Sequence, residues 1–225
     1  YKKKIFFKVE STNKLLSSID AISKEETTYY AKIIFLNASA IATAAILLNS
    51  VSPSFPNGLG NSSQQVGHNL MDHVVNEGSY GTYDGFMDKY YEGRSPGTIY
   101  IPRFQNLNHE TKNTNFIRGY GIQGKGEREH WQSISPIGFG ASLKEQLATP
   151  GKWRISLGGR GETLPNYENK ISLDTEKTDQ WGLPLVKVDF KYGPNELAMM
   201  EHMTKSSEEM LSKAGFKEVR SYRTS

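Results

Sequence analysis

Hydrophobic and polar positions follow two different patterns along this 225-residue chain. Near its start, apolar residues gather into runs. Residues 33–36 (IIFL) have no polar face, and residues 40–49 (AIATAAILLN) are apolar on all sides. A strand with no polar face is typically covered on both sides, and alanine and leucine are strong helix formers. The pattern predicts a central buried strand at 33–36 that leads into a buried helix at 40–49.

The segments around this run favour strands and a loop. Residues 4–9 alternate weakly and predict a strand. The β-rich segments 15–22 and 28–36 flank the polar sequence SKEE, which predicts a hairpin. Residues 51–65 contain two prolines, two glycines and several serines and asparagines, so they predict a loop.

From residue 73 to about residue 190, short apolar runs alternate with glycine and aromatic residues. Their spacing predicts an antiparallel sheet with strands at 73–81, 98–104, 115–122, 153–161, 170–173 and 185–190, and a helix at 142–147. A longer helix is predicted from Asn195, as its cap, to about Ala214, with Gly215 after its end. The residues expected on its apolar face are Leu197, Met200, Met203, Met210, Leu211 and Ala214. The fold class expected from these elements is α+β.

Composition excludes several classes of function. The net charge is +3, and lysine and arginine are scattered among acidic residues, so the sequence does not predict a nucleic-acid-binding surface. The chain has no cysteine, which excludes disulfides, thiolate catalysis and iron–sulfur ligation within it. Its longest apolar run, 41–48, is far shorter than the roughly 20 residues that cross a bilayer, so no transmembrane segment is predicted.

The turn Asn37-Ala38-Ser39-Ala40 joins the predicted strand to the predicted helix. Small residues at this point let the backbone approach a ligand, and helix N-termini favour phosphate groups. The alternative is that small residues serve only to pack the strand tightly against the helix.

A second cluster, VGHNLMDH at residues 66–73, holds two histidines, one aspartate and one asparagine. His68 and His73 are five residues apart with no HExxH partner, so the cluster does not predict a metal site. It also lacks the GxSxG motif of a nucleophile elbow. The alternative to a functional role is a capped turn with solvated polar groups.

Other candidate motifs are weaker. Residues 119–124 match GxGxxG by letter, but the charged sequence KGEREHWQ follows them, so they predict a glycine-rich strand or turn and no nucleotide site. Glu162 and Glu168 flank a proline-containing turn, where paired carboxylates can hydrolyse glycosides but are more often surface charges. The aromatic residues that could line a sugar site, or pack in the core, are Trp131, Trp153, Tyr167 and Trp181.

In order and separation, the two clusters resemble motifs of the glucose-methanol-choline (GMC) family of FAD-dependent oxidoreductases. The strand, turn and helix are matched at 33–36, by Asn37-Ala38-Ser39-Ala40, and at Thr43, Leu47, Leu48 and Ser50. The motif Val-Gly-x-Asn-Leu-x-Asp-His is matched by Val66, Gly67, Asn69, Leu70, Asp72 and His73. Segments 168–174 and 179–184 are similar to the turn and strand pair that precedes a long helix in the family.

The resemblance implies FAD as cofactor and oxidation of an alcohol to a carbonyl, with hydride transfer to the flavin. The residues that it implies near the cofactor are Asn37, Ala38, Ser39, Asn69, Asp72 and His73. It also implies substrate contacts from the sheet after Val74. The family usually has Ala-Gly where this chain has Ala38-Ser39, and often proline where it has Ala44.

The family's glycine-rich ADP-binding fingerprint and its catalytic histidine have no counterpart in this sequence, so no catalytic residue is assigned within it. We therefore expect the middle of a GMC enzyme, inactive by itself and a weak binder of FAD. Residues 1–73 are expected to form one edge of an FAD-binding α/β domain. Residues 74–225 are expected to form a substrate-binding domain, an antiparallel sheet flanked by helices. A narrower similarity, to the FAD subunits of sugar and sugar-acid dehydrogenases such as gluconate 2-dehydrogenase, implies a small alcohol or sugar substrate and an electron-accepting partner subunit.

A function of another class remains open on the residues alone. The aromatic and glycine-rich middle of the chain also suits a noncatalytic carbohydrate-binding or interaction module. Such a module has no need of the two motifs at 31–73 in the family's order, and this distinguishes the two hypotheses.

Overall fold

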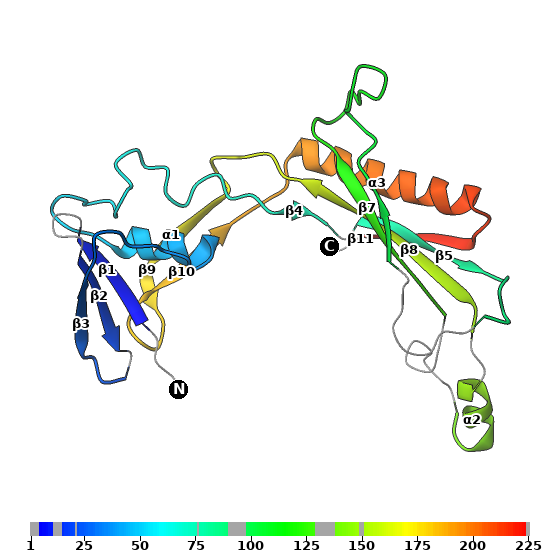
Figure 1. Ribbon diagram of the computed structural model, residues 1–225, viewed down its shortest axis with the longest axis horizontal. Helices are drawn as coiled ribbons and strands as arrows, with labels where there is room; N and C mark the ends of the chain where they lie inside the picture. Colours follow the sequence, from blue (N-terminus) through cyan, green and yellow to red (C-terminus); the bar gives the residue numbers. More distant parts are fainter. Residues whose placement is uncertain are drawn as a thin grey trace. The chain divides into compact units, whose positions relative to one another are not determined.

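The computed structural model describes residues 5–10, 15–20, 22–75, 77–89, 98–128, 138–148 and 151–223 (Figure 1). The chain divides into two compact units. Unit 1 comprises Tyr1–Met71 and Pro165–Lys191, and unit 2 comprises Asp72–Leu164 and Tyr192–Ser225.

The sequence-based division after residue 73 had assigned residues 165–191 to the second part of the chain. The structure groups them with unit 1, because they pair with its backbone. The Ile171 N–H donates to the Gly67 carbonyl at 2.8 Å, and the Leu70 N–H donates to the Asn169 carbonyl at 2.8 Å.

Unit 1 begins with a three-stranded antiparallel sheet of β1 (Ile5–Glu10), β2 (Leu15–Asp20) and β3 (Glu26–Tyr30). The predicted hairpin is confirmed as the β2–β3 pair. Its turn is held by the Asp20 carboxylate, which accepts the N–H groups of Ile22 and Ser23, each at 2.9 Å. A short side chain that bonds the backbone just after it is a standard way to fix a turn.

The prediction of a buried central strand at 33–36 is wrong. The structure has no strand there, and the side chains of Ile33 and Phe35 are 71% and 78% exposed. A strand without a polar face needs neighbours on both sides. Among the residues that the structure describes, no strand pairs with this segment.

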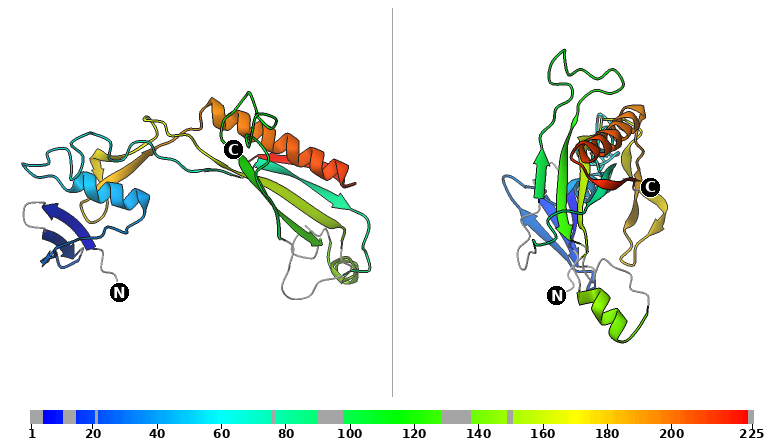
Figure 2. Two further views of the ribbon diagram at one scale, coloured as in Figure 1. Left: turned by 45° about the horizontal axis from the view of Figure 1, so that its top comes forward. Right: turned by 90° about the vertical axis from the view of Figure 1, so that its right-hand side faces the viewer.

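The predicted helix and loop that follow are confirmed. Helix α1 (Ala40–Asn49) begins directly after the small-residue turn, and irregular structure fills 51–72. Helix α1 packs beside β1 and β9 (Figure 2). Strands β9 (Lys170–Thr178) and β10 (Pro184–Asp189) form an antiparallel hairpin that completes unit 1. Although the whole helix is predicted to be buried, Ala45 is the one residue of α1 that is buried in the structure.

Unit 2 contains an antiparallel sheet with four of the six predicted strands, whereas the two predicted at 170–173 and 185–190 form the separate β9–β10 hairpin of unit 1. The strands of the unit 2 sheet are ordered β11 (Lys217–Arg223), β5 (Glu77–Tyr83), β8 (Trp153–Glu162), β7 (Tyr120–Arg128) and β6 (Thr98–Ile101), and β4 (His73–Val74) also pairs with β8. The GxGxxG sequence at 119–124 runs into β7, as a glycine-rich strand. Strand β7 begins five residues later and ends six residues later than the predicted 115–122. Strand β11 was not predicted, and the short helix α2 (Ala141–Ala148) was.

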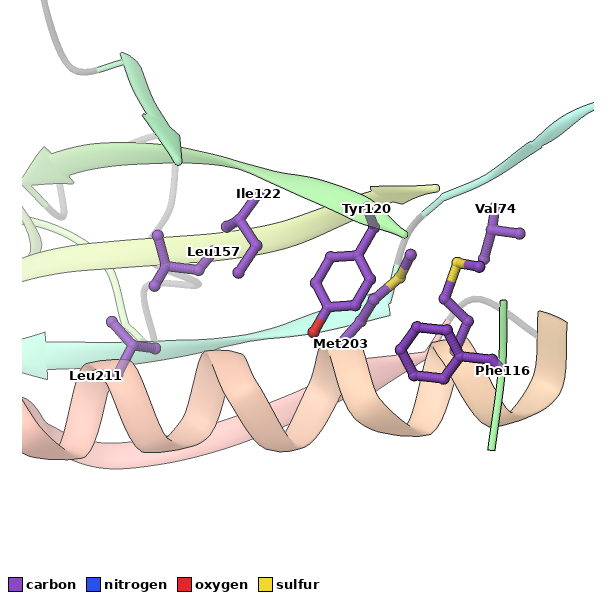
Figure 3. Packing of buried hydrophobic residues seen from close by; sticks show 8 residues of the cluster. Val74, Phe116, Tyr120, Ile122, Leu157, Met203 and Leu211 are labelled. Carbon is purple, nitrogen blue, oxygen red and sulfur yellow. The ribbon is translucent and has the colours of Figure 1, made fainter. Parts of the chain in front are cut away.

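Helix α3 (Pro194–Lys213) covers one face of this sheet (Figures 1 and 2). Glycines on β8 make the close approach possible. A Cβ atom at Gly161 would lie 2.6 Å from the Met199 sulfur, and one at Gly159 would overlap Met203. The buried core that results is shown in Figure 3, and it consists of Val74, Phe116, Tyr120, Ile122, Leu157, Met199, Met203 and Leu211.

Both ends of α3 differ in detail from the prediction. Gly193 is the N-terminal cap in place of Asn195, and its N–H donates to the Glu196 carboxylate at 2.8 Å. At the other end, the predicted role of Gly215 is confirmed. It adopts φ +85°, and the Phe216 N–H returns to the Leu211 carbonyl at 3.1 Å, which is a Schellman motif.

The predicted apolar face of α3 was partly wrong. Met203 and Leu211 are buried as expected, but Leu197 is 57% exposed, whereas Met199 is fully buried. Gly159 and Gly161 have no side chains, so the space above them accommodates Met203 and Met199 and determines which side of α3 faces the sheet.

No helix in the described part of the chain has the length and apolar character needed to span a bilayer.

A polar network lies inside unit 2, between β7 and α3. The Tyr120 hydroxyl lies 2.6 Å from Nδ1 of His202 and 3.0 Å from the Ser206 hydroxyl. Burial raises the pKa of Tyr120 to about 12. Burial, and then the positive charge of Lys205, lowers the pKa of His202. The lowered pKa favours a neutral imidazole, with Nδ1 within hydrogen-bond distance of the Tyr120 hydroxyl.

This network predicts a pH dependence of stability. Because the unfolded chain protonates His202 more readily than the folded chain, the contribution is complete above about pH 6.5 and is lost as pH falls toward the lowered folded-state pKa. One proton limits the slope to about 1.4 kcal/mol per pH unit. The free energy of unfolding, measured by urea titration from neutral to mildly acidic pH, should lose this component in His202→Gln. Identical pH profiles for the two proteins would contradict the prediction.

Candidate functional site

Unit 1 contains a shallow groove, wide open to solvent, at the start of α1, with a volume of about 550 Å³. This size lies within the range of small-molecule and cofactor sites. The groove is lined by residues from both motifs singled out in the sequence: Leu36, Asn37, Ser39, Ala40, Thr43, Ala44, Leu47, Val66 and Gly67. The structure thus joins the turn at 36–39 and the first turns of α1 to the start of the VGHNLMDH segment, which follows more than twenty residues later.

Ser39 is the residue that turns the chain into α1. Its backbone adopts φ 73° and ψ 165°, a region that is essentially restricted to glycine and costs roughly 1–3 kcal/mol for other residues. This is the position at which the GMC family usually has glycine. A serine there keeps the turn but stores strain.

No side-chain cap and no acidic residue offset the partial positive charge at the N-terminus of α1. Ser39 makes no side-chain capping bond, and the first turn carries no acidic residue. The Ser39 carbonyl accepts the Thr43 N–H at 2.9 Å, so the helix starts at this point. The unpaired N–H groups of a helix start carry partial positive charge, which suits a phosphate or another anionic group.

Gly67 holds the other side of the groove. It adopts φ +90°, and a Cβ atom there would overlap the Ile171 carbonyl oxygen. The adjacent His68 stacks on Tyr167 with ring centroids 3.8 Å apart, and its Nδ1 lies 2.7 Å from the Tyr167 carbonyl oxygen. The motif is therefore anchored to the start of the β9–β10 hairpin.

The remaining predicted cofactor residues lie outside the groove lining. Asn69 is in unit 1, with φ 57° and a long 3.4 Å bond from its side-chain amide to Gln65. Asp72 and His73 belong to unit 2. The Asp72 carboxylate accepts the His73 N–H at 2.7 Å, and the His73 carbonyl accepts the Tyr192 hydroxyl at 3.0 Å. Of the six residues, Asn37 and Ser39 line the groove and Ala38 lies between them.

The other candidate chemistry does not assemble. The described residues contain no group of three or more histidine, aspartate or glutamate side chains that could hold a metal ion. Glu162 and Glu168 fall in different units, and each has its own cation, Arg118 at 3.9 Å and Lys170 at 3.6 Å.

The aromatic residues are not gathered into one site either. Tyr167 stacks on His68, and the Trp153 indole N–H donates to the Phe86 carbonyl at 2.9 Å. Trp181 lies in the turn between β9 and β10. Trp131 lies outside the described residues.

Sequence comparison places the chain among oxidoreductases by similarity. It is 27% identical over 180 residues to 2-methyl-1,2-propanediol dehydrogenase of Mycolicibacterium austroafricanum, covering 76% of this chain and 32% of that protein. It is 25% identical over 213 residues to 6'''-hydroxyparomomycin C oxidase of Streptomyces lividus, covering 86% and 32%. It is 24% identical over 170 residues to the fructose dehydrogenase large subunit of Gluconobacter japonicus, covering 76% and 31%.

The chain therefore spans about a third of the length of these relatives. No protein-family model matches it. All three relatives are named as dehydrogenases or oxidases, which agrees with the oxidoreductase class expected from the sequence.

Proposed function

We propose that this chain is part of a GMC-type flavoenzyme that oxidises a hydroxyl group of a small molecule, with FAD bound at the groove of unit 1. The observation that carries the proposal is the groove itself. Residues 36–47 and 66–67, the two segments that resemble the family's cofactor motifs, line it together.

The local chemistry of the groove suits such a cofactor. Small side chains at Ser39, Ala40 and Ala44 leave the backbone accessible. The open N-terminus of α1 offers N–H donors and a positive partial charge to a phosphate or to a carbonyl edge of the flavin. In this role Asn37 and Ser39 position the cofactor, and Gly67 keeps the opposite wall at the distance that it requires.

The relatives support the reaction class. Their names mention a propanediol, a hydroxylated paromomycin and fructose, which all carry hydroxyl groups. When bound, FAD supplies the hydride acceptor for oxidation of such a group to a carbonyl. Because one relative is named a large subunit, an electron-accepting partner subunit is part of the proposal.

The test is visible absorbance of two purified proteins, this 225-residue chain and the product of the whole reading frame that contains it. The longer protein should show flavin bands that bleach when a diol or sugar is added without oxygen. The chain alone should bind added FAD weakly and show no turnover. Absence of flavin from both proteins, even after FAD is added, would reject the proposal and favour a noncatalytic binding module.

Ser39→Gly sharpens this test. Relief of the backbone strain should stabilise the protein by about 1 kcal/mol or more, measured by urea unfolding, with flavin binding retained. The serine hydroxyl makes no capping bond that would be lost. Loss of flavin binding in Ser39→Gly would instead assign the hydroxyl itself to the cofactor and contradict a role based on backbone shape.

A further inference from the structure

Unit 1 has a second hollow, which shares Val66 with the groove at the start of α1 but is otherwise lined by different residues. This second one, the β9 hollow, is open to solvent and has a volume of about 500 Å³, within the range of small-molecule sites. Its lining comes from two segments, residues 48–68 at the end of α1 and in the loop after it, and residues 167–173 at the start of β9. Both segments belong to unit 1, so the β9 hollow lies within one compact part of the chain.

The lining of the β9 hollow combines apolar side chains with one fixed positive charge. The apolar side chains are those of Leu48, Val51, Pro56, Val66, Ile171 and Leu173. Lys170 supplies the charge, and none of the described lining residues is a carboxylate. Its one described ion pair, with Glu168 at 3.6 Å, contributes little, because the Glu168 side chain is 70% exposed. The Lys170 ammonium can therefore take the anionic group of a ligand as its partner.

The backbone edge of β9 adds a hydrogen-bond donor to the same hollow. The Ile171 N–H donates to the Gly67 carbonyl at 2.8 Å, so this edge of the strand faces residues 66–68 and β10 pairs with the other edge. Backbone groups alternate between the two edges of a strand, so the Leu173 N–H leaves β9 on the same side as that of Ile171. Leu173 lines the hollow, and its N–H has no backbone partner in the described part of the chain. Such a donor suits a carboxylate oxygen.

A fixed pair of aromatic rings contributes to the lining of the hollow. The rings of His68 and Tyr167 stack with their centroids 3.8 Å apart and their planes at 14°. Nδ1 of His68 lies 2.7 Å from the Tyr167 carbonyl oxygen, and because a carbonyl only accepts, Nδ1 carries a proton in this bond. The Tyr167 hydroxyl donates to the Gln64 carbonyl at 3.3 Å. These bonds hold both rings before a ligand arrives, so a flat ligand ring can pack against them at little cost in side-chain entropy.

We propose that the β9 hollow is a second ligand site, separate from the FAD groove, and that it binds an aromatic carboxylate with a bicyclic body. The carboxylate pairs with Lys170 and accepts the Leu173 N–H, and the rings pack against Tyr167 and the apolar side chains of the lining. A neutral aromatic compound lacks the group that Lys170 attracts, and a small anion without a ring leaves the apolar lining in contact with water. This site goes beyond the proposed function and does not rest on it.

The experiment compares naphthylacetate with its neutral amide, naphthylacetamide, and with acetate, in calorimetric titrations of the whole-reading-frame protein. Naphthylacetate should bind about fivefold tighter than the amide, as expected for one charged contact in an open site. Acetate, which buries no ring, should bind at least about tenfold more weakly than naphthylacetate. Lys170→Gln should remove the preference for the carboxylate and leave the affinity for the amide unchanged. Lys177→Gln, in the exposed part of the same strand and outside the hollow, is the matched loss of charge and should change neither affinity.

The titrations are run with and without added FAD, which locates the probe, because the groove and the β9 hollow share only Val66. The affinity for naphthylacetate should be the same in both. Absence of binding, displacement of naphthylacetate by FAD, or a Lys170→Gln variant that still prefers the carboxylate overturns the second site, while a flavin spectrum keeps the proposed function. Binding that depends on Lys170 in a protein that takes up no flavin has the opposite meaning: the second site is supported and the FAD proposal fails.

Discussion

Replacing Gly67 by alanine should destabilise the protein by about 3 kcal/mol or more and remove flavin binding from the whole-reading-frame protein. Two effects add at this residue. Its φ of +90° is unfavourable for any residue with a Cβ atom, and that atom would overlap the Ile171 carbonyl oxygen. The Ile171 backbone cannot move aside freely, because its N–H is already bonded to the Gly67 carbonyl at 2.8 Å.

The matched control for this substitution is Gly60→Ala. Gly60 lies in the same loop and also has a positive φ, +71°, but a Cβ atom there would meet nothing within 4 Å. It should lose only the conformational part, about 1 kcal/mol, and keep flavin binding. Urea unfolding and flavin absorbance measure both outcomes. If the two alanine variants are equally stable, the close approach between Gly67 and β9 does not exist as described.

Elements with a strong local signal could be predicted from the sequence. The Asp20 carboxylate closes the β2–β3 turn through bonds to residues two and three positions later. Gly215 ends α3 at a positive φ that few other residues tolerate. In each case neighbouring residues alone determine the geometry, so no knowledge of tertiary contacts was needed.

Tertiary contacts explain most of the errors. The run at 33–36 has no polar face, but an apolar pattern does not show that another segment covers it, and Phe35 is 78% exposed in the structure. Strand β11 escaped prediction because its sequence, KEVRSYR, is mostly charged and polar. Such residues are usual on an edge strand, where they discourage pairing with other chains, and they hide the alternation that reveals a strand.

The candidate site, like the fold, could be predicted only in part. The groove joins Asn37 and Ser39 to Gly67, and resemblance to family motifs had pointed to both segments. Spacing along the sequence could not show that Asp72 falls in the other unit.

The second large effect on stability is expected from a substitution on the face of α3 that packs against the sheet. Met203→Ala should lower the free energy of unfolding by about 3 kcal/mol, since it removes a fully buried side chain from above Gly159 and leaves a cavity. Leu197→Ala, on the same helix, should cost less than about 0.5 kcal/mol, because 57% of that residue is already exposed. The sequence pattern had placed both residues on the apolar face, so urea unfolding of the pair decides between the pattern and the structure. A comparable loss in both variants would mean that α3 is rotated relative to the glycines of β8.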